Sequence, residues 1–216
     1  MIKLKRNIEL VAHAKRALAE KWGYVWGTFG QVLTETLLQQ KIRQYPSNVG
    51  DYESFIRTNW LGRRTADCVG LIKSYIWWSG DNPVYNSATD VSADGMYNAA
   101  KEKGDISTLP EIPGICLWKK GHIGIYIGNG QVIEARGTKY GVIQSPLKGT
   151  NSAGWTHWLK CPFIEYIEET QPEHWAQKYY DYLISKGIVI YDKRFDDTTT
   201  RGEMFALMAR LMGYKE

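Results

Sequence analysis

Residues 122–136 carry the pattern that most constrains the fold. In HIGIYIGNGQVIEAR, apolar residues alternate with other residues on both sides of Asn129-Gly130. Alternation with a period of two is typical of a half-buried strand, and an Asn-Gly pair between two such segments indicates a hairpin turn. We therefore predict two antiparallel strands here, within a meander that begins near residue 114 and ends near residue 144.

The register of this hairpin follows from its apolar residues. A tight two-residue turn would pair Glu134 with Ile125 and bury a carboxylate among isoleucines, at a cost of roughly several kcal/mol. One additional residue in the loop pairs Ile125 with Ile133 instead, so that the apolar side chains all face the core. Glu134 then lies diagonally beside His122. We therefore predict a three-residue or bulged loop.

Helical patterns precede these strands. Four segments have apolar residues at helical spacing: 8–22, 31–43, 68–78 and 92–103. Asn7 is expected to cap the first of them, and residues 47–66 are expected to be irregular apart from one helical turn at 54–57. Helices followed by an antiparallel meander indicate an α+β fold, with N-terminal helices packed on the sheet.

Composition limits the classes of protein that fit. The chain has 216 residues and is 44% hydrophobic, enough for one domain and a small appendage. Residues 1–167 carry a net charge of +6 and residues 168–216 carry −2, and a basic domain attracts polyanions. Because there is no Lys/Arg run or groove-binding motif, we expect no nucleic-acid partner. No segment is long and apolar enough for a membrane span, and the N-terminus lacks the apolar stretch of a signal peptide.

The three cysteines are Cys68, Cys116 and Cys161. An odd number without a C-x-x-C pattern argues against a disulfide framework or a zinc ribbon. No two histidines have the spacing of metal ligands. We therefore expect neither a metal nor another cofactor.

Cys68 begins the predicted helix over residues 68–78. The unpaired N–H groups and partial positive charge of a helix start lower the pKa of a thiol, which favours a nucleophilic thiolate. The alternative is that Cys68 is a small buried residue on the same helical face as Leu71 and Ile72. A nucleophile also needs a base within hydrogen-bond reach and a third group that orients the base.

Three segments in this order resemble the NlpC-type cell-wall peptidases, a papain-like family that cuts peptidoglycan stem peptides. Residues 67–71 (DCVGL) resemble the D-C-S-G-L signature of the family, residues 24–27 match Y-V-W-G, and residues 122–128 resemble H-V-G-I-Y-I-G. Val69 replaces the usual Ser. Residues 28–66 make the gap between the first two segments longer than is usual, and we interpret them as an insertion that either lines the cleft or is an inert surface elaboration.

The resemblance implies roles for individual residues. It makes Cys68 the nucleophile and His122 the base. Glu134 takes the place where the family carries a second His or a polar substitute, and a carboxylate there would orient the imidazole. The alternatives for Glu134 are an exposed position on an edge strand or an ion pair with Arg136. The same segments supply the expected substrate-binding residues Tyr24, Trp26 and Asp67.

Residues 166–216 are expected to form a small helical hairpin. The first helix covers about 173–186, and the second opens at the capping box of Thr200 and Glu203. His174-Trp175-Ala176, residues 186–189 and residues 200–203 (TRGE) resemble one S-layer-homology repeat. Such repeats bind secondary cell-wall polymers, usually several repeats together. A single repeat leaves three alternatives: self-association into a homo-oligomer, docking on the catalytic domain, or a packing appendage.

We therefore expect two domains, a catalytic domain over residues 1–165 and an S-layer-homology-like module over 166–216. The expected function is a thiol peptidase that cleaves an amide bond of the peptidoglycan stem peptide, by resemblance the D-γ-glutamyl bond to the diamino acid. Alternatives are an N-acetylmuramoyl-L-alanine amidase with the same Cys/His site, or a non-catalytic wall-binding protein. Without a signal peptide, we expect a phage or prophage endolysin, made in the cytoplasm and released by lysis or non-classical export.

Overall fold

The computed structural model describes residues 5–167, 176–187, 198 and 200–214. The chain divides into two compact units, residues 1–168 and 169–216. The larger unit combines helices with an antiparallel sheet, so the predicted α+β class is confirmed. None of the described helices is long and apolar enough to cross a membrane.

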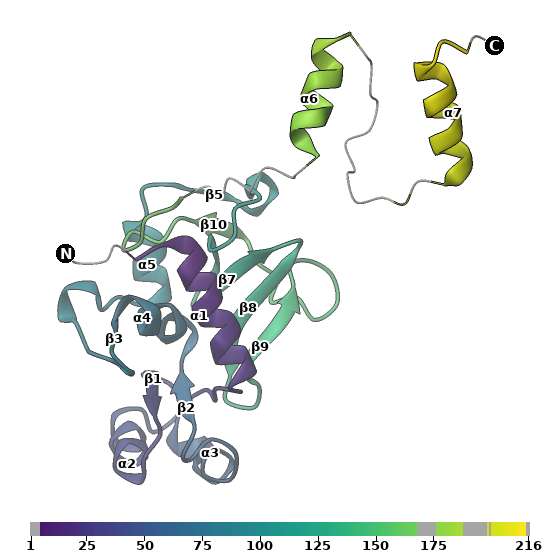
Figure 1. Ribbon diagram of the computed structural model, residues 1–216. Helices are drawn as coiled ribbons and strands as arrows, with labels where there is room; N and C mark the ends of the chain where they lie inside the picture. The colour runs from purple at the N-terminus through teal and green to yellow at the C-terminus, as the bar shows by residue number, and fades with distance from the viewer. Residues whose placement is uncertain (1–4, 168–175, 188–197, 199, 215–216) are drawn as a thin grey trace. The chain divides into compact units, whose positions relative to one another are not determined.

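A six-stranded sheet forms the centre of the larger unit (Figure 1). Its strands lie in the order β5-β10-β6-β7-β8-β9, and neighbouring strands are antiparallel. Their bounds are β5 Lys103–Asp105, β6 Cys116–Lys119, β7 His122–Gly128, β8 Gln131–Gly137, β9 Gly141–Pro146 and β10 His157–Leu159. Strands β6 to β9 form the predicted meander. Strands β5 and β10 have three residues each, too few for their alternation to be recognised in the sequence.

Three helices lie against this sheet: α1 (Asn7–Ala19), α4 (Cys68–Ile76) and α5 (Ala93–Ala99). Helix α4 packs on β7 and β8, and α1 packs on α4 and on β7 to β9. The core between them includes Leu10, Ile72, Ile125 and Ile133, all with no exposed surface. Burial of these apolar side chains stabilises the position of α4 on the sheet.

The register of the β7–β8 hairpin is the predicted one. Ile125 pairs with Ile133, and the ladder shifts between Tyr126 and Gly128. One additional residue, Ile127, therefore lies in a bulge of β7, which confirms the bulged alternative. At the turn, Asn129 and Gly130 have φ values of 52° and 67°, the left-handed conformation that Asn-Gly hairpin turns require.

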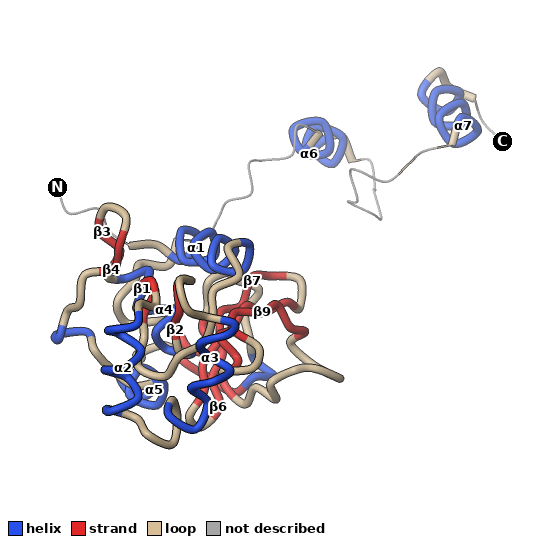
Figure 2. The backbone as a smooth tube through the Cα atoms, turned by 90° about the horizontal axis from the view of Figure 1, so that it is seen from below, coloured by secondary structure: helices blue, strands red, loops and turns tan. Residues whose placement is uncertain are grey.

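Residues 28–66 form an ordered lobe, and four of its residues make a small separate core together with Val25: Leu33, Leu38, Val49 and Ile56. Figure 2 shows its helices α2 and α3 beside the short strands β1 and β2. The bounds are β1 Phe29–Val32, α2 Glu35–Gln44, α3 Glu53–Asn59 and β2 Arg64–Ala66, with a 3-10 turn at Gly50–Tyr52. The predicted helix over 31–43 begins only at Glu35, because residues 29–32 pair with β2 and Thr34 caps α2.

Three smaller features complete this unit: the strand pair Trp78–Ser79 (β3) and Asn82–Pro83 (β4), and 3-10 turns at Ser87–Thr89 and Ile106–Thr108. The predicted cap at Asn7 is wrong. Arg6 precedes the helix without a side-chain cap, and the Asn7 amide instead donates to the backbone oxygens of Pro113 and Ile167. The helix predicted over 92–103 ends at Ala99, because residues 103–105 form β5.

In the smaller unit, the described elements are α6 (Gln177–Ser185) and α7 (Arg201–Leu211). The capping box is confirmed: Thr200 Oγ1 accepts from the Glu203 N–H at 3.2 Å, and a Glu203 carboxylate oxygen accepts from the Thr200 N–H at 2.8 Å. The large apolar side chains of α7 are exposed: Met204, Phe205, Leu207, Met208 and Leu211. His174, Trp175, Ile188 and Val189 lie outside the described residues.

Gly70 allows the backbone of the lobe to cross α4. The Thr28 carbonyl accepts from the Asp67 N–H at 3.0 Å, and a Cβ atom on Gly70 would lie 2.0 Å from the same carbonyl oxygen. Backbone atoms on both sides leave no room for adjustment. A glycine is therefore required at this point of α4.

We predict that Gly70→Ala destabilises the fold by about 2 kcal/mol or more, because the added methyl group must displace the Thr28 backbone. Gly50→Ala is the matched control, since its Cβ would meet only Ile42 at 3.7 Å. Thermal unfolding of both variants measures the effect. Equal melting temperatures for the two variants would contradict this account of Gly70.

Candidate active site

The N-terminus of α4 is fixed by a buried carboxylate. Asp67 is the N-cap residue, and its Oδ1 accepts from the Gly70 N–H at 2.6 Å. Its Oδ2 accepts from the Gly27 N–H at 2.8 Å. One side chain therefore caps the helix and also ties residues 24–27 to it. Cys68 is the first residue of α4 and is 6% exposed.

The Cys68 thiol lies in a low-dielectric environment. Burial first, and then the neighbouring Asp67 carboxylate, raise its pKa to about 12. Hydrogen bonds from the backbone N–H groups of Ile123, Val69 and Cys68 itself act in the opposite direction. The prediction that the helix start lowers this pKa is therefore wrong. The effect of desolvation, which raises the pKa, is larger than the effect of the N–H groups at the helix start, which lower it. Cys68 needs a base in order to react.

The hydrogen bond from Ile123 shows which residues face the sulfur. Pairing between β7 and β8 begins at Ile125. Alternate N–H groups of a strand point to the same side, so the N–H of Ile123 points the same way as that of Ile125 and is available to Cys68. His122 is the residue before Ile123. The packing of α4 on β7 thus brings Cys68 to the beginning of the strand that carries His122.

A chain of hydrogen bonds orients His122. Its Nε2 lies 2.6 Å from Glu134 Oε2, and Glu134 Oε1 accepts from the Ser145 hydroxyl at 2.6 Å. Glu134 has no exposed surface, which contradicts the alternative of an exposed position. The other alternative was an ion pair with Arg136. Arg136 Nη1 lies 3.9 Å from Glu134 Oε1, a longer contact than the one between Glu134 and His122. The predicted neighbourhood of Glu134 and His122 is confirmed.

The charged form of Glu134 is stabilised by these partners. Burial would raise the pKa of this carboxyl group, but the hydrogen bonds from His122 and Ser145 outweigh burial and lower it. The carboxylate is therefore ionised at neutral pH. Since Nε2 of His122 is occupied by Glu134, Nδ1 is the ring nitrogen left for a second hydrogen bond.

Trp155 covers one face of the His122 ring. The two rings are stacked, with centroids 5.2 Å apart and planes 11° apart. Gly124 makes room for the indole, because a Cβ atom there would lie 2.8 Å from it. Trp155 is buried in a third apolar cluster with Tyr126 and Val132. Its contact with His122 depends on the path of the loop before β10, which the sequence pattern does not predict.

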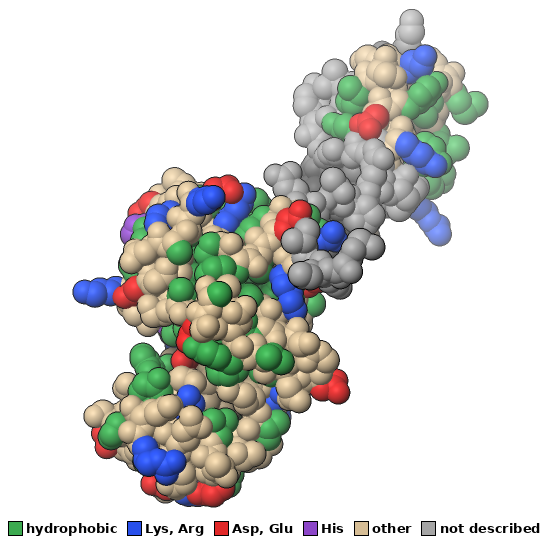
Figure 3. Space-filling model, turned by 90° about the vertical axis from the view of Figure 1, so that its left-hand side faces the viewer, with side chains coloured by type: hydrophobic (Ala, Val, Ile, Leu, Met, Phe, Trp, Pro, Cys, Tyr) green, Lys and Arg blue, Asp and Glu red, His purple; other side chains and the backbone are tan. Residues whose placement is uncertain are grey.

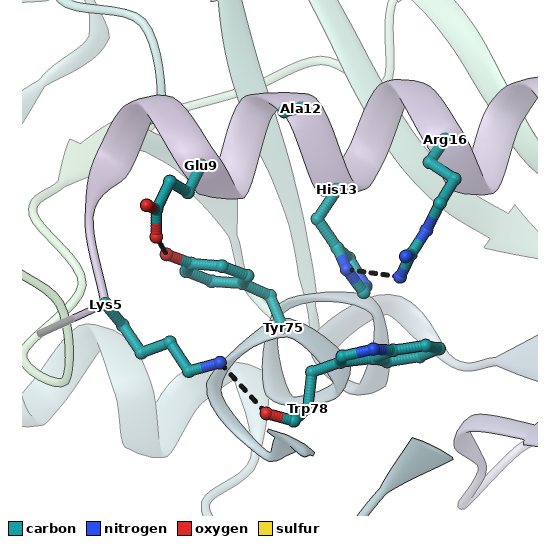
Figure 4. Close-up of a pocket in the computed structure, with 7 residues that line it drawn as sticks. All are labelled: Lys5, Glu9, Ala12, His13, Arg16, Tyr75 and Trp78. Carbon is teal, nitrogen blue, oxygen red and sulfur yellow. Dashed lines mark hydrogen bonds between the residues drawn. The ribbon is translucent and has the colours of Figure 1, made fainter. Parts of the chain in front are cut away.

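The other histidines are placed differently. His13 lies in a separate cavity of about 380 Å³ between α1 and the end of α4 (Figure 4). Its Nε2 bonds to the Ser74 hydroxyl at 2.7 Å, its Nδ1 lies 3.0 Å from Arg16, and burial lowers its pKa to about 3. His157 lies in β10, and His174 is outside the described residues. His13 is thus held neutral within the fold.

The remaining two cysteines are buried away from this site. Cys116 and Cys161 are free thiols, and the hydrogen bond that the Cys116 thiol donates to Cys161, together with burial, raises the pKa of Cys116. Cys116 therefore keeps its proton at neutral pH. In the described part of the chain, no group of three or more His, Cys, Asp or Glu side chains is arranged to hold a metal ion.

Cys68 opens into a cleft of about 580 Å³. Its lining comes from α4, from the segment before α5, and from the lobe through Lys41, Gln44 and Tyr45. Figure 3 shows this unit hollowed between the part that holds α2 and α3 and the part above it, with hydrophobic side chains around the hollow. The lobe therefore lines the cleft, and the alternative of an inert elaboration is wrong.

The expected substrate-binding residues have different surroundings. Trp26 is 39% exposed and lines the cleft. Asp67 also lines it, but both of its oxygens accept backbone N–H groups. Tyr24 is buried; burial first, then the charges of Cys68 and Asp67, raise the pKa of its phenol. Tyr24 thus brings a neutral hydroxyl group into the neighbourhood of Cys68.

Comparison with known proteins gives a distant likeness. No family model matches the chain, and no curated protein matches it. Seven chains of solved structures do match. The peptidoglycan hydrolase RipB of Mycobacterium tuberculosis is 20% identical, with 74% of this chain and 67% of that chain covered and a TM-score of 0.39.

Two further matches are of the same quality. NlpC2 of Trichomonas vaginalis is 18% identical, with 74% of this chain and 49% of that chain covered and a TM-score of 0.41. The P60 domain of an antigen from M. avium subspecies paratuberculosis is 20% identical, with 74% and 98% covered and a TM-score of 0.39. These three solved structures are thus a peptidoglycan hydrolase, an NlpC protein and a P60 domain.

We predict that Glu134→Gln changes how stability depends on pH. Because the folded-state pKa of Glu134 is lowered, its charge stabilises the fold above the unfolded pKa, and this contribution is lost as the pH falls towards the folded pKa. The variant should therefore be less stable than the parent by about 1.5–3 kcal/mol at neutral pH, the range of a charge-assisted hydrogen bond. Denaturant unfolding should show this difference shrinking below about pH 4.5; a difference that stayed constant down to about pH 3 would contradict the assignment.

Proposed function

We propose that the larger unit is a papain-like cysteine peptidase that hydrolyses an amide bond in the stem peptide of peptidoglycan. The observation that carries the proposal is the position of Cys68: it opens α4, faces the backbone of β7 next to His122, and lines a cleft. His122 is in turn held by the buried Glu134. A thiol, a base and a group that orients the base are the parts of a nucleophilic site.

The chemistry follows from these contacts. Nδ1 of His122 accepts the thiol proton, because Nε2 donates to Glu134. The N–H groups of Ile123, Val69 and Cys68 stabilise the thiolate, which attacks the carbonyl carbon of the amide. The imidazolium gives its proton to the departing amine, and water then hydrolyses the thioester, with His122 again taking a proton.

Three neighbours assist this cycle in our proposal. Tyr24 keeps its proton because burial and the charges of Cys68 and Asp67 raise its pKa, so its hydroxyl group can donate to the oxyanion that forms at the carbonyl. Glu134 stabilises the imidazolium because it stays ionised. Trp155 shields the pair from water, which strengthens the interaction between the two charges.

The substrate is inferred from two lines of support. Residues 24–27, 67–71 and 122–128 resemble the NlpC-type peptidases, and the solved structures that match include domains of that name and a peptidoglycan hydrolase. The bond that we propose is the one between the D-γ-glutamyl residue and the diamino acid. Cleavage between muramic acid and L-alanine would use the same Cys/His site and is the second candidate. The origin as a phage or prophage endolysin stays a prediction.

We predict a graded loss of wall lysis across the site. Cys68→Ala and Cys68→Ser should abolish turnover, because no other group takes over the attack. His122→Ala should also reduce it severely, and Glu134→Gln less, by roughly 10²–10³-fold, as expected for a group that assists a base. Release of soluble fragments from purified peptidoglycan measures the rates.

Controls for this series are Cys116→Ala and Cys161→Ala, which should keep most of the activity because both thiols lie away from the cleft. A chelator should have little effect. Near-normal turnover by Cys68→Ala would sink the cysteine-peptidase proposal and favour a non-catalytic wall-binding protein.

We also propose that the smaller unit associates between chains and so restores a binding surface for a secondary cell-wall polymer. The support is the resemblance of residues 200–203 to one S-layer-homology repeat, together with the exposure of Phe205 (63%), Leu207 (60%) and Leu211 (68%) on α7. Exposed apolar area of this kind favours association. Docking on the larger unit is the competing arrangement.

We predict that the full chain is oligomeric and that a chain ending at Glu168 is monomeric, because truncation removes the apolar face of α7. Multi-angle light scattering measures both masses, and sedimentation with purified walls measures their binding. Two monomers with equal wall affinity would leave the smaller unit without either proposed role.

A further inference from the structure

Lys41 is a buried cation in the cleft that holds Cys68. It comes from α2 of the lobe, is 8% exposed, and lines the same cleft. Its ammonium group donates to Gln44 Oε1 at 3.0 Å and lies 5.7 Å from the centre of the Tyr45 ring. These partners are uncharged, and an ammonium group that has lost most of its water is stable only with compensating interactions.

The other charged groups of the cleft have partners of their own. Lys73 forms an ion pair with Asp90 at 2.6 Å. Asp67 accepts two backbone N–H groups, and Asp94 accepts from the Trp118 indole and the Gly121 N–H. Within the residues that the structure describes, no ion pair joins Lys41 to a carboxylate. Among the described residues that line the cleft, Lys41 is thus the cation that is available to pair with an anionic ligand.

Lys41 is also fixed in position relative to the nucleophile. The Tyr45 ring packs on Gly27, where an added Cβ would lie 2.6 Å from it. Gly27 donates to Asp67, the residue before Cys68. The end of α2 is therefore connected to the start of α4 through direct contacts. Burial lowers the pKa of Lys41, whereas the charge of Asp67 raises it, so a further anion would stabilise the ammonium form.

We propose that Lys41 binds a carboxylate of the substrate peptide and thereby selects free-acid over amidated stem peptides. This inference rests on the proposed function. Stem peptides offer two such groups near the scissile bond: the α-carboxylate of the D-glutamyl residue, which a short methylene spacer separates from the attacked carbonyl, and a carboxylate of the diamino acid. An amide at that position would leave the ammonium group buried without an anion, which opposes binding.

The test measures peptide binding to the full chain carrying Cys68→Ala, which prevents turnover. The probes are L-alanyl-γ-D-glutamyl-L-lysine, its D-glutamyl α-amide and its lysine α-amide. One of the two amides should bind about 10- to 100-fold more weakly than the free acid, the range that hydrogen bonds to charged groups give. Which amide it is identifies the carboxylate that Lys41 holds.

Added to the same background, Lys41→Met should bring acid and amide to equal affinity, and Lys41→Arg should keep the preference. Lys15→Met, on the exposed face of α1, is the matched control and should change nothing. Three outcomes would overturn the inference. All three peptides could bind equally to the chain with Lys41 intact, none of them could bind, or the preference for the free acid could survive Lys41→Met.

Turnover by the parent chain is measured separately. Cleavage of the tripeptide with equal binding of acid and amides would preserve the proposed function and reject the role of Lys41. Acid-selective binding without any cleavage would reject the proposed peptidase function and preserve the role of Lys41 in binding a carboxylate.

Discussion

The buried carboxylate of Asp67 is the interaction on which the site depends. Its oxygens accept from Gly70 in α4 and from Gly27 in the preceding loop, at 2.6 Å and 2.8 Å. Desolvation raises the pKa of this group, and the N–H donors act against that effect. A carboxylate there joins helix, loop and lobe, because Tyr45 packs on Gly27. Removing it would leave buried N–H groups without partners and loosen these parts together.

This arrangement explains how a thiol with a raised pKa can be a nucleophile. Burial protects Cys68 from spontaneous ionisation, while His122 lies on the adjoining strand with one nitrogen bonded to Glu134. In the proposed mechanism, proton transfer creates the thiolate and imidazolium together, between N–H donors on one side and a carboxylate on the other. Low dielectric makes each of these interactions stronger than it would be in water.

Sequence reasoning reached the parts of the site that follow from local pattern. Alternation in residues 122–136 predicted the register, and with it the placement of Glu134 beside His122. It did not find Trp155 or Lys41, because each reaches the site through the path of a loop or the packing of a separate lobe. It also misjudged the Cys68 pKa, since a helix start is visible in sequence whereas the extent of burial is not. Asn7 was assigned to a cap although it bonds residues 113 and 167, distant in sequence.

The central claim is that Cys68 attacks a stem-peptide carbonyl and carries the acyl group. The most direct measurement is the intact mass of the full chain, quenched in acid during turnover of purified peptidoglycan fragments, followed by peptide mapping. We predict a transient increase in mass equal to the acyl part of the stem peptide, located on Cys68, together with release of the matching amine fragment. Fragments released by cleavage of the sugar chain, or turnover with no adduct and with Cys68 dispensable, would contradict it.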